Sequence, residues 1–346
     1  MANILYGVNG EGSGHSSRAR EVITHLEAQS HRVYVASFDR GYSNLKSDFD
    51  VVEIDGLRLA YVHNRVRYGK TVVRNLLRMP QVTGRVRALG RMASDWNLDL
   101  VISDFEPITC HFGHKLGIPV ITIDNQHVLT DTEINYPREY RKEAAAAKLI
   151  TRLMTPRARA RLVISFFRAR IKKKSTFLFS PILRQQVLKA SPHDGEALLV
   201  YVTSGAAELA DLLKTVPCHF ICYGFNREGQ DQNLEFRKPG LDSFLNDLSH
   251  CRAVIANAGF SLISEALYLG KPYLAWPVKR QFEQIFNAFY IEQMGYGMYR
   301  DELSRQDVEL FLSQLSGYRE NLATYPRMDN SVLFGKLDRL IANFVR

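Results

Sequence analysis

Short apolar runs alternate with amphipathic stretches along this chain, and the alternation starts a second time after residue 194. In the first half, the apolar runs predict strands at residues 4–8, 32–38, 100–103 and 118–123, and residues 16–28 have the spacing of a helix. Strands that alternate with helices in this way form parallel sheets with helices packed on their faces. The first half therefore predicts one α/β domain.

The second half of the chain repeats this organisation. Its predicted strands lie at 197–203, 219–223, 253–256 and 273–275, and its predicted helices at 241–249, 262–269 and 284–294. A chain of 346 residues is also too long for one ordinary hydrophobic core. We predict an α/β protein with two Rossmann-like domains, residues 1–180 and 181–330, joined by a linker within residues 180–194. A last helix in residues 331–346 is expected to cross back to the first domain.

The composition is that of a cytoplasmic protein. Four cysteines in a chain of this length do not make a disulfide framework. No apolar run reaches the roughly 20 residues that cross a bilayer. The N-terminal segment MANILYGVNGEG has neither a basic region nor a cleavable apolar stretch, so we expect no secretion signal.

Basic residues are distributed unevenly along the chain. The net charge is +9, yet residues 56–94 contain nine Lys or Arg and no acid, and residues 144–193 contain twelve and no acid. The rest of the chain is acidic overall. Because a basic surface concentrates anionic partners, we expect lipid headgroups, phosphorylated acceptors or nucleic acid as candidate partners.

A glycine-rich segment follows the first predicted strand and precedes the first predicted helix. Gly10, Gly12 and Gly14 would let the backbone approach a ligand closely, and the start of the helix favours an anion. We therefore place Gly12 and Gly14 in a phosphate or acceptor loop. The spacing differs from the dinucleotide fingerprint, and no acidic residue ends the second strand, which argues against a nicotinamide cofactor.

His15 begins the helix at the carboxyl end of a central strand. A neutral imidazole there can take a proton from an acceptor hydroxyl, so we predict that His15 is a general base; a capping or packing histidine is the alternative. Asp104 follows the strand at 100–103 and is expected to orient His15 and stabilise its protonated ring. Its alternative role is the N-cap of the helix that starts near Pro107, and Glu106 is the second candidate for the acidic partner.

Residues 257–288 read NAGFSLISEALYLGKPYLAWPVKRQFEQIFNA and predict a nucleotide-sugar pocket. Gly259 allows close backbone approach at the start of a helix, and Ser261 can cap that helix or donate to a phosphate. Glu265, one turn on, can accept hydrogen bonds from both hydroxyls of a ribose; its alternative role is a favourable charge in the first helical turn.

Two further segments complete this predicted pocket. Glu283 and Gln284 open the next helix and are expected to contact sugar hydroxyls. Ser204 and Gly205 follow the first strand of the second half. They form a second candidate phosphate turn, or an ordinary turn between a strand and a helix.

Three motifs of the chain resemble those of GT-B glycosyltransferases. GEGSGH is similar to an N-terminal glycine-rich loop that ends in histidine, NAGFSLISE to a donor signature that ends in glutamate, and WPVKRQFEQIFNA to the closing segment of that signature. The chain looks most like the branch that contains the peptidoglycan lipid-intermediate N-acetylglucosaminyltransferase and the UDP-glucosyl- and UDP-glucuronosyltransferases. The resemblance implies two domains facing across a cleft, and inverting sugar transfer without a metal or any cofactor beyond the nucleotide sugar.

The same resemblance assigns roles within the second domain. Glu265 matches the glutamate that binds the ribose, and Glu283–Gln284 match a pair that contacts the donor sugar. Asn257 is expected to lie at the donor, but it stands where plant-type members carry histidine, so one phosphate contact departs from the pattern. Phe236 is, with the Arg that follows it, our candidate for the segment that binds uracil.

We expect no metal site. Asp48 and Asp50 have Asp-x-Asp spacing, but a solvated turn is the more typical origin of that pattern. Two groups of Cys and His residues also occur, namely Cys110, His111 and His114, then Cys218 and Cys222. Neither group supplies four ligands at zinc spacing, so we expect these side chains to be packed in the interior instead.

A basic and apolar segment covers residues 149–174. Its Lys and Arg residues are interleaved with Leu, Val, Ile and Phe, which is the composition of a helix lying on an anionic lipid surface. A domain helix with a solvated basic face is the alternative. Within the segment we place an acceptor or membrane face at Arg157, Arg161, Arg168 and Lys172. The basic residues of 65–91 are also helix-like and are expected to share that surface.

These expectations combine into one function and two alternatives. We expect transfer of a sugar from a UDP-type donor to a hydroxyl of an anionic or lipid-linked acceptor, in the cytoplasm or on the cytoplasmic face of the membrane. A nucleotide-sugar hydrolase or epimerase of the same fold is the first alternative, because the glycine loop, His15 and Arg18 also suit such enzymes. A non-catalytic nucleic-acid-binding protein is the second, although few aromatic residues are interleaved with the basic stretches.

Overall fold

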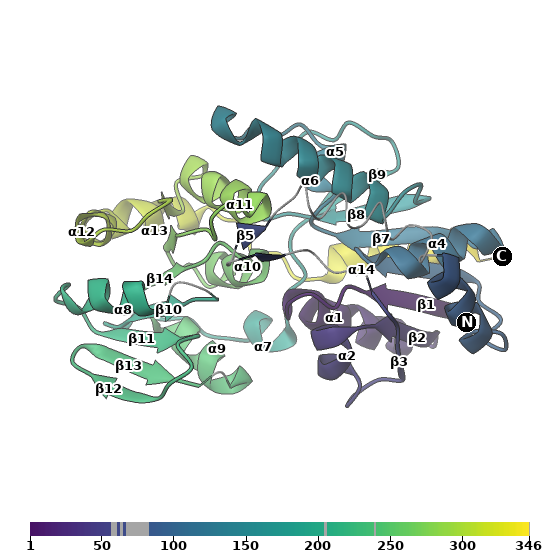
Figure 1. Ribbon diagram of the computed structural model, residues 1–346, viewed down its shortest axis with the longest axis horizontal. Coiled ribbons are helices and arrows are strands. Elements are labelled where there is room, and N and C mark those ends of the chain that lie inside the picture. The colour runs from purple at the N-terminus through teal and green to yellow at the C-terminus, as the bar shows by residue number, and fades with distance from the viewer. Residues whose placement is uncertain (57–60, 63–64, 67–82, 204–205, 239, 346) are drawn as a thin grey trace. The chain divides into compact units, whose positions relative to one another are not determined.

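The computed structural model describes residues 1–56, 61–62, 65–66, 83–203, 206–238 and 240–345. The chain forms two compact units. As far as their residues are described, the N-terminal unit comprises Met1–Tyr61, Arg67–Arg184 and Asp329–Arg346, and the C-terminal unit comprises Val62–Val66 and Gln185–Met328. Each unit is built around its own seven-stranded sheet (Figure 1).

The sheet of the N-terminal unit is parallel throughout, with the strand order β3-β2-β1-β6-β7-β8-β9. Its strands are β1 (Asn3–Val8), β2 (Arg32–Ser37), β3 (Val51–Glu53), β6 (Leu100–Asp104), β7 (Val120–Asp124), β8 (Ala160–Ile164) and β9 (Thr176–Phe179). The helices around it are α1 (Gly14–Ala28), α2 (Asp39–Leu45), residues 83–92, α4 (Pro107–Leu116), α5 (Val128–Asp131), a 3-10 turn (Arg138–Tyr140), α6 (Arg141–Met154) and α14 (Ser331–Phe344).

The sheet of the C-terminal unit has the order β12-β13-β11-β10-β14-β15-β16, and only the pairing of β12 with β13 is antiparallel among its described pairs. Its strands are β10 (Leu198–Tyr201), β11 (Phe220–Tyr223), β12 (Gly229–Asp231), β13 (Leu234–Arg237), β14 (Ala253–Ala256), β15 (Tyr273–Ala275) and β16 (Gly297–Tyr299). Its helices are α7 (Gln185–Leu188), α8 (Ala206–Lys214), α9 (Leu241–His250), α10 (Phe260–Tyr268), α11 (Phe282–Gln293), α12 (Arg305–Ser313) and α13 (Leu315–Ala323). A separate pair of short strands is formed by β4 (Tyr61–Val62) and β5 (Arg65–Val66).

The register of the N-terminal sheet decides which side chains share a face. Val8 of β1 lies beside Asp104 of β6, so both side chains leave the same face of the sheet. The opposite face packs its apolar residues against α4 and α6, in a core that includes Val101, Phe112 and Ile150. Strands buried on both faces read as continuous apolar runs, which is why β1, β6 and β7 are visible in the sequence.

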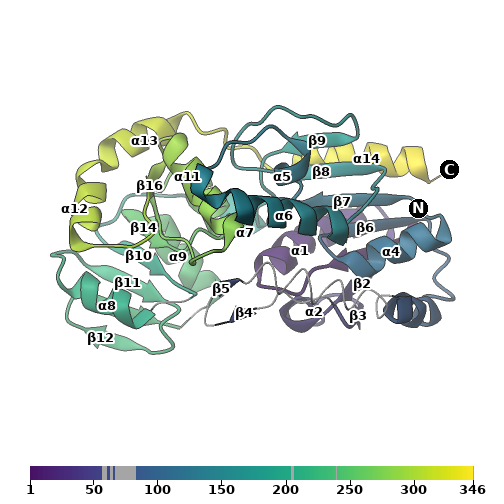
Figure 2. The ribbon, with the colours of Figure 1, turned by 45° about the horizontal axis from the view of Figure 1, so that its top comes forward.

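The C-terminal helix α14 belongs to the N-terminal unit. Its Phe334 ring stacks on the His25 ring of α1 with the centroids 4.2 Å apart, and its Asp338 Oδ1 lies 2.8 Å from His25 Nε2. The ammonium group of Lys336 lies over the Phe177 ring of β9. Both ribbon views show α14, in yellow, among the strands and helices of this unit (Figures 1 and 2).

Residues 149–174 do not form one helix, so the expectation of a helix there is wrong. α6 ends at Met154, and β8 then runs through the sheet between β7 and β9. Every residue of β8 is buried, because a strand inside a parallel sheet is covered on both faces. Of the basic residues at 65–91, positions 67–82 lie outside the described part of the chain. In the part that is described, no helix is both long and apolar enough to cross a bilayer.

Candidate functional site

Residues 9–13 link β1 to α1. Gly10 packs so closely against the chain at Phe38 that an added Cβ would lie 2.0 Å from the Phe38 carbonyl oxygen. Gly12 has a φ of +77°, in the left-handed region that side chains disfavour. Gly14 is the first residue of α1, which places His15 in the first turn of that helix. Close approach at one position and backbone conformation at the other therefore explain two of the three predicted loop glycines.

His15 and Asp104 face each other at the carboxyl edge of the N-terminal sheet. Nδ1 of His15 lies 2.7 Å from Oδ1 of Asp104. Asp104 ends β6 beside the end of β1, and α1 starts just beyond β1, so the parallel topology brings together two residues that are far apart in the sequence. The His15 side chain is 13% exposed, whereas that of Asp104 is completely buried. The structure thus joins the two residues, and their catalytic roles stay predictions.

Arg18 completes this cluster, although sequence reasoning did not include it among the site residues. It lies on α1 one turn after His15, and its Nε donates to Oδ2 of Asp104 at 2.6 Å while its Nη2 donates to Oδ1 at 2.5 Å. Its Nη1 donates to the side-chain oxygen of Asn125, which follows β7, at 3.1 Å. The available signal was the spacing of three between His15 and Arg18, which puts both on one side of a helix.

The Asp104 carboxyl is ionised despite its burial. Burial alone would raise the pKa of Asp104, but the charges of Arg18 and His15 and their hydrogen bonds outweigh it and hold that pKa below its ordinary value. Burial lowers the pKa of Arg18, and Asp104 reverses that effect, so the pKa of the guanidinium is raised. Asp104 is therefore a permanent acceptor for an N–H of the His15 ring.

Glu106, the second candidate for the acidic partner, has a different task. It is the N-cap of α4: its carboxylate accepts from the backbone N–H groups of Ile108, at 2.9 Å, and Thr109, at 2.6 Å. It also accepts from the Thr109 hydroxyl at 2.7 Å. The alternative assignment of this cap to Asp104 is therefore wrong, and Asp104 is left to pair with His15 and Arg18.

A second buried His–Asp pair lies on the other face of the same sheet, and sequence reasoning missed it. Nδ1 of His127 lies 2.7 Å from Oδ2 of Asp124, the last residue of β7. The Thr155 hydroxyl lies 3.3 Å from Nε2 of the same ring. His127 is 2% exposed and Asp124 is 1% exposed. Because a substrate in solution cannot reach a pair this deeply buried, we interpret its role as structural.

The predicted donor segment begins where β14 ends. Gly259 is the N-cap of α10, and no side chain forms a capping hydrogen bond there. A Cβ added to Gly259 would meet nothing within 4 Å, so the approach to the start of this helix is open. Ser261 is half-buried in the first turn of α10, and Glu265 is 7% exposed, further along the helix. An open helix start of this kind suits the phosphate role that the sequence suggested.

Asn257 holds two loops together. Its Oδ1 accepts from the backbone N–H of Thr203, at 2.7 Å, and from the Thr203 hydroxyl, at 3.0 Å. Its Nδ2 donates to the Trp276 carbonyl at 2.8 Å, and its own carbonyl accepts from the Tyr273 hydroxyl at 2.7 Å. Within the described residues, the side-chain amide is thus engaged with the ends of β10 and β15.

Two of the remaining predicted donor residues, Glu283 and Gln284, lie in the first turn of α11. Gln284 is 8% exposed, and its Oε1 accepts from the Val278 N–H at 2.9 Å, which closes the loop before α11. Glu283 is half-buried in the first turn of α11. Ser204 and Gly205 lie outside the described residues.

The candidate uracil segment is at the end of β13. Phe236 is 3% exposed and belongs to the core of the C-terminal unit. Arg237 donates from Nη1 to Asp247 at 2.6 Å and from Nε to Glu235 at 2.8 Å. Both side chains therefore have structural partners within the C-terminal unit.

Three of the four residues of the predicted basic face are exposed. Arg157, Arg168 and Lys172 lie in the segments that flank β8. Arg161 does not belong with them: it is 9% exposed within β8, and its Nε lies 3.6 Å from Oδ2 of the buried Asp131. Its placement on an exposed acceptor or membrane face is therefore wrong, because β8 lies inside a parallel sheet and is buried on both faces.

The sequence contains aspartate, cysteine and histidine groups of the types that can bind metals. Among the residues that the structure describes, no group of three or more His, Cys, Asp or Glu side chains could hold a metal ion. Asp48 pairs with Arg20. Burial raises the pKa of Cys110 and of Cys222 to about 12, so both thiols are neutral at neutral pH.

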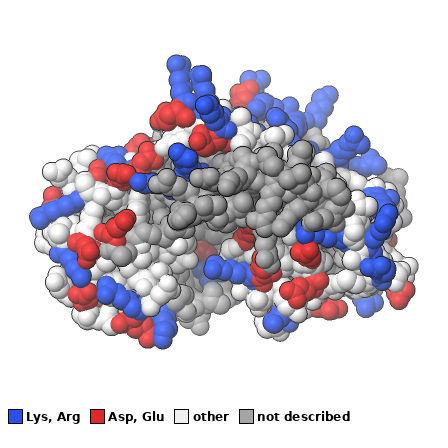
Figure 3. Space-filling model, in the orientation of Figure 1, with Lys and Arg blue, Asp and Glu red and all other residues white. Residues whose placement is uncertain are grey.

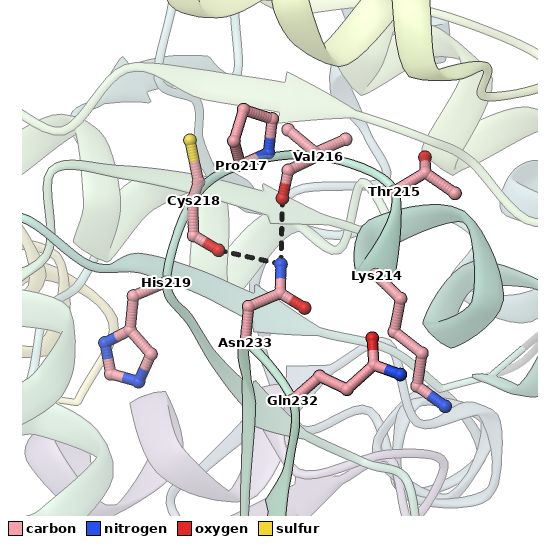
Figure 4. Close-up of a pocket in the computed structure, with 8 residues that line it drawn as sticks. All are labelled: Lys214, Thr215, Val216, Pro217, Cys218, His219, Gln232 and Asn233. Atoms are coloured by element: carbon pink, nitrogen blue, oxygen red, sulfur yellow. Dashed lines mark hydrogen bonds between the residues drawn. The ribbon is translucent and has the colours of Figure 1, made fainter.

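A pocket of about 460 Å³ lies in the C-terminal unit, and Figure 4 shows the residues that line it. It is bounded by the turn between α8 and β11 and by the residues before β13, at the amino edge of the parallel strands. Asn233 closes that turn by donating to the carbonyls of Leu213, Val216 and Cys218. Of the predicted donor residues that the structure describes, none lines this pocket; Asn257 and Gly259, for example, follow the carboxyl end of β14.

Comparisons with known proteins agree with this architecture. A sequence similar to this chain is an uncharacterized glycosyltransferase of Methanosarcina mazei, 24% identical over 333 residues that cover 85% of this chain and 84% of the relative. A second is the UDP-N-acetylglucosamine–N-acetylmuramyl-(pentapeptide) pyrophosphoryl-undecaprenol N-acetylglucosamine transferase of Clostridium tetani, 34% identical over 122 residues, or 34% of this chain and 32% of that protein.

The fold is also that of solved glycosyltransferases. The crystal structure of the kitacinnamycin glycotransferase superposes with a TM-score of 0.73 over 100% of this chain and 99% of that chain, at 15% identity. The predicted GT-B architecture is confirmed by this likeness and by the two parallel-dominated sheets. The sequence model of the family described as "Glycosyl transferase family 1" matches residues 2–316. The chain therefore belongs to glycosyl transferase family 1 and is a glycosyltransferase.

Proposed function

We propose that this protein moves a sugar from a UDP-linked donor to a hydroxyl of an anionic or lipid-linked acceptor, with inversion and without a metal. The observation that carries the proposal is the contact of 2.7 Å between Nδ1 of His15 and Oδ1 of Asp104. An ionised carboxylate only accepts hydrogen bonds, so a proton on Nδ1 satisfies this contact and leaves the lone pair of Nε2 for a substrate proton. His15 is also the partly exposed member of the pair.

The proposed reaction is a single displacement. The acceptor oxygen gives its proton to Nε2 of His15 while it forms a bond to the anomeric carbon. The bond from that carbon to the diphosphate breaks, and the nucleoside diphosphate leaves with the electron pair. Attack from the side opposite the leaving group inverts the anomeric centre. Asp104 stabilises the imidazolium through the N–H on Nδ1.

The C-terminal unit would hold the donor in this proposal. The uncapped start of α10 offers backbone N–H groups and the positive end of the helix dipole to the diphosphate, which supports charge neutralisation without a metal. Glu265 would accept from the ribose hydroxyls. A UDP-linked donor is supported by the name of the Clostridium tetani relative, whose match to this chain is partial.

The exposed face of α6 is our candidate for the surface that meets a lipid-linked acceptor. It presents Leu149 and Leu153, one turn apart and 43% and 42% exposed. The exposed basic residues of the same helix are Arg141, Lys142 and Arg152. In Figure 3, Lys and Arg side chains gather along the top of the view, where Figure 1 places α6. Apolar side chains framed by cations fit a bilayer that contains anionic lipid, and each such cation adds about 1 kcal/mol at that surface.

Vesicle binding tests this surface. The protein is expected to sediment with vesicles of phosphatidylcholine and phosphatidylglycerol, and the Leu149→Glu/Leu153→Glu variant is expected to lose that binding. Leu310→Glu is the matched control, since Leu310 is 43% exposed on α12 of the other unit. Equal binding of all three proteins, or binding that does not depend on anionic lipid, would contradict the assignment.

The proposed reaction is tested with labelled UDP-sugars and membrane lipid extracts as acceptors. His15→Ala is expected to lower transfer by about 10²- to 10⁴-fold, the usual contribution of a general base. His25→Gln serves as the control, because it breaks another His–Asp pair on the same helix. Full transfer by the His15 variant would refute the base assignment. Rapid release of free sugar without acceptor would favour a nucleotide-sugar hydrolase instead.

Donor binding is tested separately by calorimetry with UDP. Glu265→Ala removes the carboxylate proposed to accept from the ribose. A hydrogen bond to a charged group contributes about 1.5–3 kcal/mol, so UDP should bind roughly 10- to 100-fold more weakly. Unchanged UDP affinity in this variant would remove Glu265 from the donor site.

A further inference from the structure

Arg18 is placed where its charge acts on both members of the proposed catalytic pair. Its side chain is 5% exposed, and its Nε and Nη2 donate hydrogen bonds to the two carboxylate oxygens of Asp104. Its Nη1 is anchored by Asn125 at the end of β7, so three planar donors are fixed by two elements other than its own helix. A guanidinium held at three points cannot swing away when the neighbouring ring changes its protonation state.

Nη2 of Arg18 also lies 2.7 Å from Nδ1 of His15. Two proton arrangements are compatible with neutral His15. With the proton on Nδ1, the ring donates to Asp104 and Nε2 is a free base; with the proton on Nε2, Nδ1 accepts from Arg18 and the ring cannot act as a base. Oδ1 of Asp104 lies at the same distance of 2.7 Å from Nδ1, and as an acceptor it requires the proton on Nδ1. Ionised Asp104 selects the first arrangement, and Arg18 keeps Asp104 ionised.

The charge balance of the cluster then sets how readily the ring takes a second proton. Asp104 and Arg18 together are neutral, so protonation of His15 places an unbalanced positive charge beside a fixed guanidinium. Without Arg18, the same protonation would form a neutral pair of imidazolium and carboxylate, which an interior environment favours. Arg18 therefore opposes premature protonation of the base.

We propose that Arg18 is a positioning residue that keeps His15 in the Nδ1-protonated, neutral form, ready to accept a proton through Nε2. This inference rests on the proposed role of His15 as general base. It concerns a residue that touches neither the donor nor the acceptor in the proposed reaction and acts only through Asp104 and His15.

The other ionisable groups around the cluster do not replace this effect. Tyr6 of β1 is fully buried, and its burial raises the pKa of its phenol far above the ordinary value, so the phenol stays neutral. Asp124 at the end of β7 acts on the charge of Arg18 from the opposite face of the sheet, where it is paired with His127. Asp104 is the carboxylate in contact with His15, and Arg18 is the cation in contact with both.

The test is a pH titration of the His15 ring by nitrogen-15 NMR on the full chain, with the ring signals assigned by their loss in His15→Gln. The wild-type ring is expected to carry its neutral-pH proton on Nδ1. In Arg18→Gln, the midpoint of the ring titration should move up by about 1–3 pH units, the usual effect of an unbalanced carboxylate. Arg18→Lys keeps the charge but loses the planar fork, so a smaller shift is expected. Arg20→Gln, on the same helix with its own aspartate partner, should leave the titration unchanged.

A double variant distinguishes an effect of the Arg18 charge from a general loss of stability. Arg18→Gln/Asp104→Asn removes both charges, so the ring titration should return toward the wild-type midpoint even where stability has fallen. An unmoved midpoint in Arg18→Gln, or a wild-type ring with its proton on Nε2, would overturn the inference. An unmoved midpoint leaves the proposed base role of His15 standing, whereas a ring with its proton on Nε2 contradicts that role as well. Full transfer by His15→Ala refutes the base role whatever the titration shows, and none of these results refutes sugar transfer itself.

Discussion

Replacement of Asn257 by alanine probes the part of the C-terminal unit that is proposed to hold the donor. The Asn257 side chain is in contact with the end of β10 through Thr203 and with the end of β15 through Trp276. Only 4% of this residue is exposed. Alanine keeps the backbone but removes all three side-chain hydrogen bonds, so the two loops lose their shared anchor.

The expected loss of stability follows from the three hydrogen bonds that alanine removes, at 2.7, 3.0 and 2.8 Å. Each is worth about 1 kcal/mol net. Thr203 is exposed and recovers water as a partner, whereas Trp276 is half-buried. We therefore expect a loss of about 2 kcal/mol, which lowers Tm by about 4–8 °C in a unit of this size.

Urea unfolding and calorimetry with UDP measure the two consequences. The free energy of unfolding should fall by about 2 kcal/mol. If about 1.4 kcal/mol of that loss applies to the loop conformation that binds UDP, UDP should bind about tenfold more weakly. Asn246→Ala is the matched control, because Asn246 is exposed on α9. If Asn257→Ala lost no more stability than the control, the proposed role of Asn257 in holding the two loops together would be refuted.

Three further outcomes are expected. The pKa of Asp104 is lowered in the folded state, so its stabilising contribution is present above the ordinary carboxyl range and is lost as pH falls through the folded pKa. Below about pH 4, the free energy of unfolding should therefore drop more steeply in wild type than in Asp104→Asn. Glu106→Ala removes the α4 cap and should cost about 1–2 kcal/mol in thermal unfolding, and a neutral result would contradict the cap assignment. Lys271 is 1% exposed and donates to the His193 carbonyl at 2.8 Å, so Lys271→Met should cost about 1–3 kcal/mol in urea unfolding, and an equally stable variant would show that this contact contributes nothing.

Strand prediction succeeded where strands are continuously apolar and failed where they are not. β1, β6 and β7 are apolar runs next to glycine or polar turns, as buried parallel strands require. β8 was missed because Arg161 and the flanking basic residues give residues 149–174 the composition of an amphipathic helix. The charge of Arg161 is tolerated in the interior because Asp131, which is distant in sequence, lies nearby. Local sequence does not contain that information.

The sequence by itself determined the α/β class, the helix start that carries His15, and the acidic residue at the end of the strand that faces it. These follow from local rules, since the carboxyl ends of parallel strands meet at one edge of a sheet. The tertiary structure alone decided which carboxylate caps α4 and which pairs with His15, and that the Asn257 amide is used to tie two loops together. It also placed the guanidinium of Arg18 in contact with both His15 and Asp104. Such choices depend on the side-chain direction and burial that packing imposes, and neither is a property of a residue and its neighbours in the chain.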